Sequence, residues 1–127
     1  MDRKFLLTAF AYGIVGLALG IHMASTKQHG QLVTHAHIML LGFIVTFVYA
    51  LCHRLWLPDG GGRLANLQFY AHHAGSIVMF AGLYGLYGGL AQESVLGPLL
   101  GISSIVVMVS LLLMMVMLVR APTVASH

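Results

Sequence analysis

Four long apolar segments, separated by short polar breaks, constrain this 127-residue chain more than any other feature. They lie at about residues 5–24, 32–53, 65–91 and 95–119, and each is long enough as a helix to cross roughly 30 Å of hydrocarbon. The breaks contain the turn-forming stretches STKQHGQ, LPDGGGR and QESVLGP. The pattern therefore predicts an all-α fold, an integral membrane four-helix bundle in which residues 1–127 form a single domain.

The composition supports a membrane protein and excludes several other classes. Hydrophobic residues make up 59% of the chain and charged residues only 7%, which is too apolar for a soluble domain of this size. The six basic residues form no stripe, so nucleic acid is not an expected partner. The single cysteine, Cys52, excludes a disulfide within the chain and a cysteine-based zinc site. The first segment is longer than a usual signal-peptide core, so we expect it to remain as a span.

The basic residues predict the orientation in the membrane. In the four-span arrangement five of them fall at the termini and in the central break, and only Lys27 falls on the opposite side. By the positive-inside rule both termini are then cytoplasmic, and the loops at residues 25–31 and 92–95 face outward. We expect the cytoplasmic membrane of a bacterium or archaeon. The five basic residues on the inner side are Arg3, Lys4, Arg54, Arg63 and Arg120.

Eight histidines outnumber all lysines and arginines together, and histidine is the commonest metal ligand. His35 and His37 lie roughly 6–10 Å below the outer edge of the second segment, where polar groups are costly and usually functional. Residues two apart on a helix point about 200° apart. The pair therefore cannot hold one metal ion, and we expect it to serve two centres on opposite flanks of the helix. A structural role in bonding neighbouring helices is the alternative.

Three further residues belong to the same predicted site. His22, at the end of the first segment, lies near the same outer face. Met39 and Gly42 continue the face of His35, and Gly42 is expected to leave room for a flat group.

His72 and His73 form a second cluster, about 12 Å nearer the inner face. A metal site and a packing role are equally favoured for this pair. His29 and His53 are expected at the membrane interfaces, where solvent or lipid headgroups would satisfy them.

Small and sulfur-containing residues are expected to serve packing. Gly13, Gly16 and Gly20 in the first segment, and a glycine-rich third segment, predict close helix contacts. Methionines scattered round the last segment are better explained as lipid-facing residues than as metal ligands. They are Met108, Met114, Met115 and Met117.

The stretch VTHAHIMLLGF, residues 33–43, resembles the haem-binding helices of subunit I of the haem–copper oxidases and nitric oxide reductases. It is also similar to short four-span proteins related to that subunit. In that family one helix carries a low-spin haem histidine in a His-Ala-x-x-Met context, which residues 35–39 reproduce. Another carries His-x-His, whose two histidines bind different haems on opposite sides of the helix. The clear match covers roughly a fifth of the chain.

The resemblance implies haem b held by His35 and His37. It also implies a homo-oligomer, with a trimer favoured over a dimer, in which His35 of one chain and His37 of its neighbour form the axial pair. Pairing of either residue with His22 is an alternative. Copper is weakly supported, because the chain lacks a His-Pro-Glu-x-Tyr motif and the His-His pair in YAHHAGS lies near the inner end of its segment.

The leading hypothesis is a membrane b-type cytochrome, surrounded by lipid, that exchanges electrons with an unidentified redox partner or quinol. Electron transfer is favoured over the activity of a complete oxidase. One alternative is a haem protein with an open iron position that binds or reduces nitric oxide or oxygen. Another is a cofactor-free membrane subunit or a transition-metal carrier.

Overall fold

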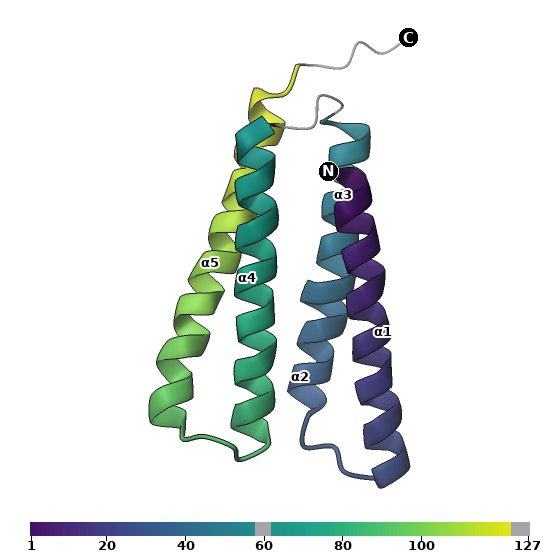
Figure 1. Cartoon of the computed structure of the whole chain (residues 1–127), viewed down its shortest axis with the longest axis vertical. Coiled ribbons are helices and arrows are strands. Elements are labelled where there is room, and N and C mark those ends of the chain that lie inside the picture. The colour runs from purple at the N-terminus through teal and green to yellow at the C-terminus, as the bar shows by residue number, and fades with distance from the viewer. Residues whose placement is uncertain (58–61, 123–127) are drawn as a thin grey trace.

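The computed structural model describes residues 1–57 and 62–122, which form helices and no strand. Figure 1 shows two antiparallel helical hairpins lying side by side. The prediction of an all-helical, four-helix arrangement is confirmed. The first hairpin consists of α1 (Asp2–Thr26) and a second long helix made of α2 (Leu32–His37), the π-helix η1 (Ile38–Val45) and α3 (Thr46–Leu55); the second consists of α4 (Gly62–Tyr87) and α5 (Glu93–Arg120).

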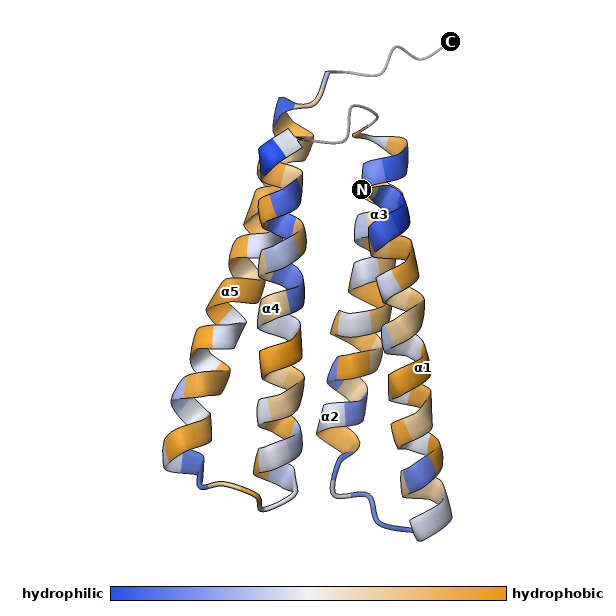
Figure 2. Cartoon of the chain, in the orientation of Figure 1, coloured by the Kyte–Doolittle hydropathy of each residue, from blue (hydrophilic) through white to orange (hydrophobic). Residues whose placement is uncertain are grey.

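Three of these helices are long and apolar enough to cross a membrane, namely α1, the continuous helix Leu32–Leu55, and α5. The helix α4 has 26 residues, but the half nearer the termini contains several hydrophilic residues (Figure 2). Among them are Gln68 and His72, whose side chains are fully buried. These two polar side chains therefore face protein, and this helix depends on its neighbours more than the other three do.

The predicted third segment ended too late. It was expected to run to residue 91, whereas α4 ends at Tyr87. Gly89 has a φ of 68°, and the backbone N–H of Leu90 donates to the carbonyl of Gly85 at 2.9 Å. Such a left-handed glycine commonly ends a helix. Residues 58–61 of the predicted LPDGGGR break, and the tail residue His127, lie outside the described residues.

The second long helix changes its hydrogen-bonding pattern directly after His37. Residues Ile38–Val45 form a π-helix, in which backbone bonds span five residues, and such segments are frequent at functional sites. The parts of the helix on both sides of this segment contact α1, and its polar bonds reach α1 through His35 and α4 through Thr46. The π-helix therefore lies between the two residues that make these bonds.

Glycines allow close approach within each hairpin. A Cβ at Gly16 would lie 3.0 Å from a side-chain carbon of Ile38, and one at Gly20 would lie 2.9 Å from the ring of His35. In the second hairpin, a Cβ at Gly75 would lie 3.1 Å from a backbone oxygen of α5. Small residues permit such contacts between helices, so the predicted packing role is confirmed.

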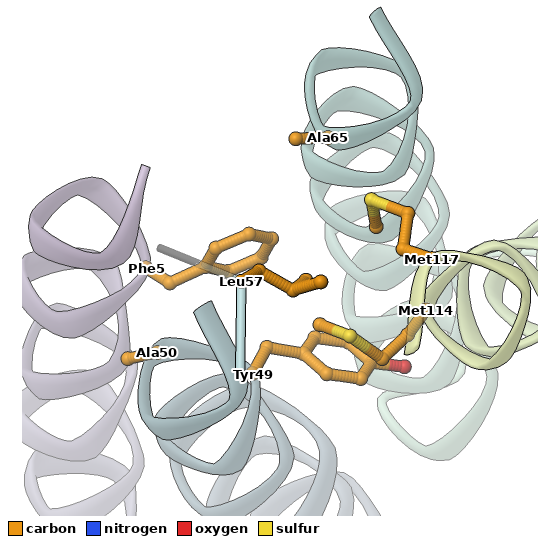
Figure 3. Close-up of a cluster of buried hydrophobic side chains, with 7 residues drawn as sticks. All are labelled: Phe5, Tyr49, Ala50, Leu57, Ala65, Met114 and Met117. Carbon is orange, nitrogen blue, oxygen red and sulfur yellow. The ribbon is translucent and has the colours of Figure 1, made fainter. Parts of the chain in front are cut away.

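The two hairpins meet in a hydrophobic cluster near the end of the bundle that carries the termini (Figure 3). Phe5 of α1 and Tyr49 of α3 are buried there, and Met114 and Met117 project into it from α5. The predicted lipid-facing position is therefore wrong for Met114 and Met117, while the other two methionines of the last segment are exposed. The cluster consists of Phe5, Tyr49, Ala50, Leu57, Ala65, Met114 and Met117.

Candidate functional site

His35 lies where α2 packs against α1. Its Nδ1 atom is 2.8 Å from the carbonyl oxygen of Gly16, and its ring lies beside Gly20. Because a carbonyl oxygen only accepts hydrogen bonds, Nδ1 must carry the proton when the ring is neutral, and Nε2 then carries the lone pair. The half-buried ring is thus fixed as one tautomer.

His37 has the same hydrogen-bonding pattern on another side of the helix. Its Nδ1 atom is 2.8 Å from the carbonyl oxygen of Val33, one turn earlier in its own helix, and the residue is exposed. The two imidazoles therefore leave α2 on different sides, as the spacing predicted. His35 faces α1, and His37 faces outward.

The arrangement of both rings suits a metal ligand. A histidine that binds a metal through one ring nitrogen almost always donates its other N–H to a carbonyl, a carboxylate or water. His35 and His37 both donate to backbone carbonyls, which leaves two neutral Nε2 donors of the kind that coordinates haem iron. Both rings therefore have the hydrogen-bonding pattern that a histidine ligand of haem would have.

Met39 and Gly42 do not line open space beside His35. Met39 packs against Gly16 of α1. A Cβ at Gly42 would lie 2.9 Å from the Cβ atom of Tyr12. The prediction that Gly42 leaves room for a flat group is therefore wrong, because the aromatic side chain of α1 fills that space.

His22 is exposed near the end of α1 and lines a cavity of about 310 Å³ between the ends of α1 and α4. Gln31 and Tyr84 line the same cavity. Gln31 donates to the carbonyl of Tyr84 at 3.0 Å and accepts from the hydroxyl of Thr34 at 2.7 Å. These bonds tie the loop after α1 to α4, so His22 lies beside a defined, partly polar hollow.

His72 and His73 contact different helices of the first hairpin. The Nε2 atom of His72 is 2.7 Å from the hydroxyl oxygen of Thr46 in α3. The Nδ1 atom of His73 is 2.7 Å from the hydroxyl oxygen of Tyr12 in α1. Both residues therefore join the two hairpins, which fits the packing role that the sequence left open.

The two histidine pairs lie at different levels of the bundle. His35 lies beside Gly20 and bonds the carbonyl of Gly16, whereas His73 bonds Tyr12, one turn before Gly16 on α1. The two pairs therefore lie at different levels, while the separation of about 12 Å stays a prediction.

His53 is the histidine that the sequence analysis placed wrongly. It was expected at the interface, but it is only 3% exposed. Its Nε2 atom is 2.9 Å from the Oε1 atom of Gln68, and its ring stacks on Phe5 with centroids 5.1 Å apart. Gln68 could have indicated this burial from the sequence. It lies four residues before His72 on α4, and that spacing predicts one polar helix face.

Phe5 packs against three imidazoles at this level, and His72 and His73 also contact each other with ring centroids 5.1 Å apart. Its ring centroid is 5.1 Å from that of His53, 6.3 Å from that of His72 and 5.9 Å from that of His73. Within residues 1–57 and 62–122, no three His, Cys, Asp or Glu side chains form a group that could hold a metal ion. The arrangement of His72 and His73 therefore gives no support to the predicted second metal site.

Comparisons of the chain with protein-family models, with curated proteins and with solved structures found no match. The site must therefore be interpreted from its own side chains. The strongest features are the two carbonyl-bound imidazoles of α2 and the buried polar groups between the hairpins.

Proposed function

We propose that the protein is a membrane b-type cytochrome that binds haem b through His35 and His37 and transfers electrons. The observation that carries the proposal is the carbonyl-bound Nδ1 of both rings, which leaves both Nε2 atoms as metal donors. Haem would supply a one-electron iron couple there, and its ligation by both His35 and His37 would favour electron transfer over binding of a gas. Copper is not part of the proposal.

The ligands of one haem come from two chains. His35 faces α1 and His37 faces outward on the same short helix, so a single protomer cannot direct both rings at one iron. In a closed oligomer, His35 of one protomer pairs with the outward-facing His37 of its neighbour, and the same contact repeats at every interface. A trimer is the favoured state and a dimer the alternative.

The proposed setting is the cytoplasmic membrane of a bacterium or archaeon, with all four helices spanning it and both termini in the cytoplasm. Arg3, Lys4 and Arg54 lie at the end of the bundle that carries the termini, with Arg63 and Arg120, whereas Lys27 lies at the other end. This asymmetry supports the orientation. Reporter enzymes that work only in the cytoplasm should be active when they are fused to either terminus. Activity of a reporter that works only outside the cytoplasm would contradict the orientation.

The absorption spectrum of the purified protein tests haem binding. The reduced protein should show the sharp α and β bands of low-spin haem. His35→Ala and His37→Ala should each abolish these bands, because each removes one of the two histidines that would hold the haem. The matched control is His29→Ala, since His29 is exposed in the loop before α2, and this variant should keep the bands.

Two outcomes would overturn the proposal. Absence of haem after expression with ample haem supply would exclude a cytochrome. Retention of a bis-histidine spectrum in either alanine variant would exclude the shared site. A high-spin spectrum in the unmodified protein would instead favour an open iron position that binds nitric oxide or oxygen.

A further inference from the structure

A stripe of buried polar residues runs along α4 on the side that faces the first hairpin. Gln68, His72 and Ser76 are spaced four residues apart and are fully buried. Gln68 bonds His53 and His72 bonds Thr46, both in α3. We call Gln68, His72 and Ser76 the polar stripe. It lies in the half of the bundle nearer the termini, apart from the proposed haem ligands.

Every member of the polar stripe has a buried atom without a hydrogen-bond partner among the described residues. These atoms are the Nε2 of Gln68, the Nδ1 of His72 and the Oγ of Ser76. The Nδ1 of His53 and the Nε2 of His73, beside the stripe, are unpaired as well. Buried polar atoms are nearly always satisfied by protein, by ordered water or by a ligand, so an occupant is needed here.

The hydrogen bonds of the two buried histidines fix which atoms accept. The Nε2 of His53 must donate to the carbonyl-type Oε1 of Gln68, which leaves its Nδ1 as an unpaired acceptor. The hydroxyl of Thr46 donates to the carbonyl of Leu41 at 3.3 Å. With that proton on the Leu41 side, the hydroxyl oxygen accepts from the Nε2 of His72, and in this tautomer the Nδ1 of His72 is also an unpaired acceptor.

The unpaired set mixes donors and acceptors, which favours water over a metal ion. The amide Nε2 of Gln68 is a donor and would repel a cation, whereas the Nδ1 atoms of His53 and His72 accept. A water molecule donates two hydrogen bonds and accepts others, so it can satisfy both kinds of atom. Buried water typically makes about three such bonds to groups that are otherwise unsatisfied.

We propose that ordered water fills the polar stripe and exchanges protons between the imidazole of His53, near the end with the termini, and that of His73 in the middle of the bundle. The path ends at His73, whose Nε2 is unpaired and whose Nδ1 bonds the hydroxyl of Tyr12. Each transfer breaks one O–H or N–H bond and forms another at the next atom, so no oxidant or co-reactant is consumed. Polar residues inside membrane helices commonly serve such relays.

This path leads toward the proposed haem ligands but does not depend on them. Tyr12 lies one turn from Gly16, the residue whose carbonyl accepts from His35. A proton held by His73, which bonds Tyr12, would therefore lie near the turn of α1 that carries Gly16. The water itself can be detected in protein that contains no haem.

Solid-state NMR of ¹⁵N-histidine-labelled protein in lipid bilayers tests the proposal. Magnetisation transferred from water should reach the ring nitrogens of His53 and His72. Ser76→Ala should reduce this transfer at His72 severalfold. The matched control is Ser103→Ala, since Ser103 is equally buried but its hydroxyl already donates to the carbonyl of Leu100, and this variant should leave the transfer unchanged.

Exchange into D₂O tests the proton path on the same samples. The Nε2 proton of His72 should be replaced while the backbone amide protons of α4 remain. A ring proton that persists as long as those amides would exclude the path. Absence of magnetisation transfer from water to His72 would show a dry cluster. Stoichiometric changes in the chemical shifts of His53 and His72 on addition of Zn²⁺ would show a metal site. Either result would overturn the proposal.

Discussion

The hydrogen-bond partner of each histidine decides what its second ring nitrogen can do. His35 and His37 donate to backbone carbonyls and keep a lone pair on Nε2. His53 and His72 bond side chains through Nε2 and keep a lone pair on a buried Nδ1. These four histidines are therefore of two kinds, one with a free Nε2 lone pair near α2 and one that belongs to the buried polar network between the hairpins.

The close contact between Gly20 and His35 gives the first prediction. Gly20→Val adds a Cβ that would lie 2.9 Å from the ring, so His35 must shift. The variant should lose haem and be destabilised by about 1–3 kcal/mol, as in other overpacked contacts. Gly101→Val is the control, because a Cβ at Gly101 meets nothing within 4 Å. Haem content and the temperature of thermal unfolding are measured in detergent. Equal values for the two variants would contradict the close contact between Gly20 and His35.

The bond between His53 and Gln68 gives the second prediction. His53→Leu and Gln68→Leu each leave the partner side chain unpaired in the interior, which should lower the free energy of unfolding by about 1–3 kcal/mol. The double variant should lose less than the sum of the two, because neither polar group then remains. Denaturant titration of all three variants measures this coupling. Strictly additive losses would contradict a direct interaction.

The sequence predicted the directions of His35 and His37 correctly because the helical repeat fixes the angle between nearby side chains. It could not predict that Tyr12 occupies the space beside Gly42, since that contact depends on the register between two helices. The burial of His53 was missed for the same reason. Its partner, Gln68, lies on a helix of the other hairpin.

At the scale of elements, α4 differs from the other long helices. It matches them in length, but it carries its polar stripe toward the first hairpin and its glycines toward α5. The sequence predicted four helices because apolar length and turn residues are local properties. The π-helix at Ile38–Val45 was not predicted, since no local residue pattern distinguishes it from an α-helix.

The polarity of α4 gives the third prediction. Tested alone as a single segment in a membrane-insertion assay, residues 62–87 should insert poorly, because polar side chains at mid-helix oppose insertion. The helix α5, which is long and apolar enough to span, should insert efficiently and serves as the control. Replacing Gln68 and His72 by leucine should raise the insertion of α4. Efficient insertion of unmodified α4 would contradict its dependence on the first hairpin.

At the scale of the whole molecule, two hairpins are joined by polar bonds as well as by the hydrophobic cluster. Thr46–His72, Tyr12–His73 and His53–Gln68 all connect the first hairpin to α4. Many large apolar side chains remain exposed on the outer faces of the helices, which suits contact with lipid or with other chains. The outward-facing His37 lies on this outer surface.

The ratio of haem to chain, measured together with the detergent-corrected mass, tests the central claim most directly. In any closed oligomer that pairs His35 of one chain with His37 of the next, the number of such pairs equals the number of chains. The account therefore predicts one haem for each chain, on an oligomer and never on a monomer. A monomer that keeps a bis-histidine haem spectrum, or an oligomer without haem, would contradict it.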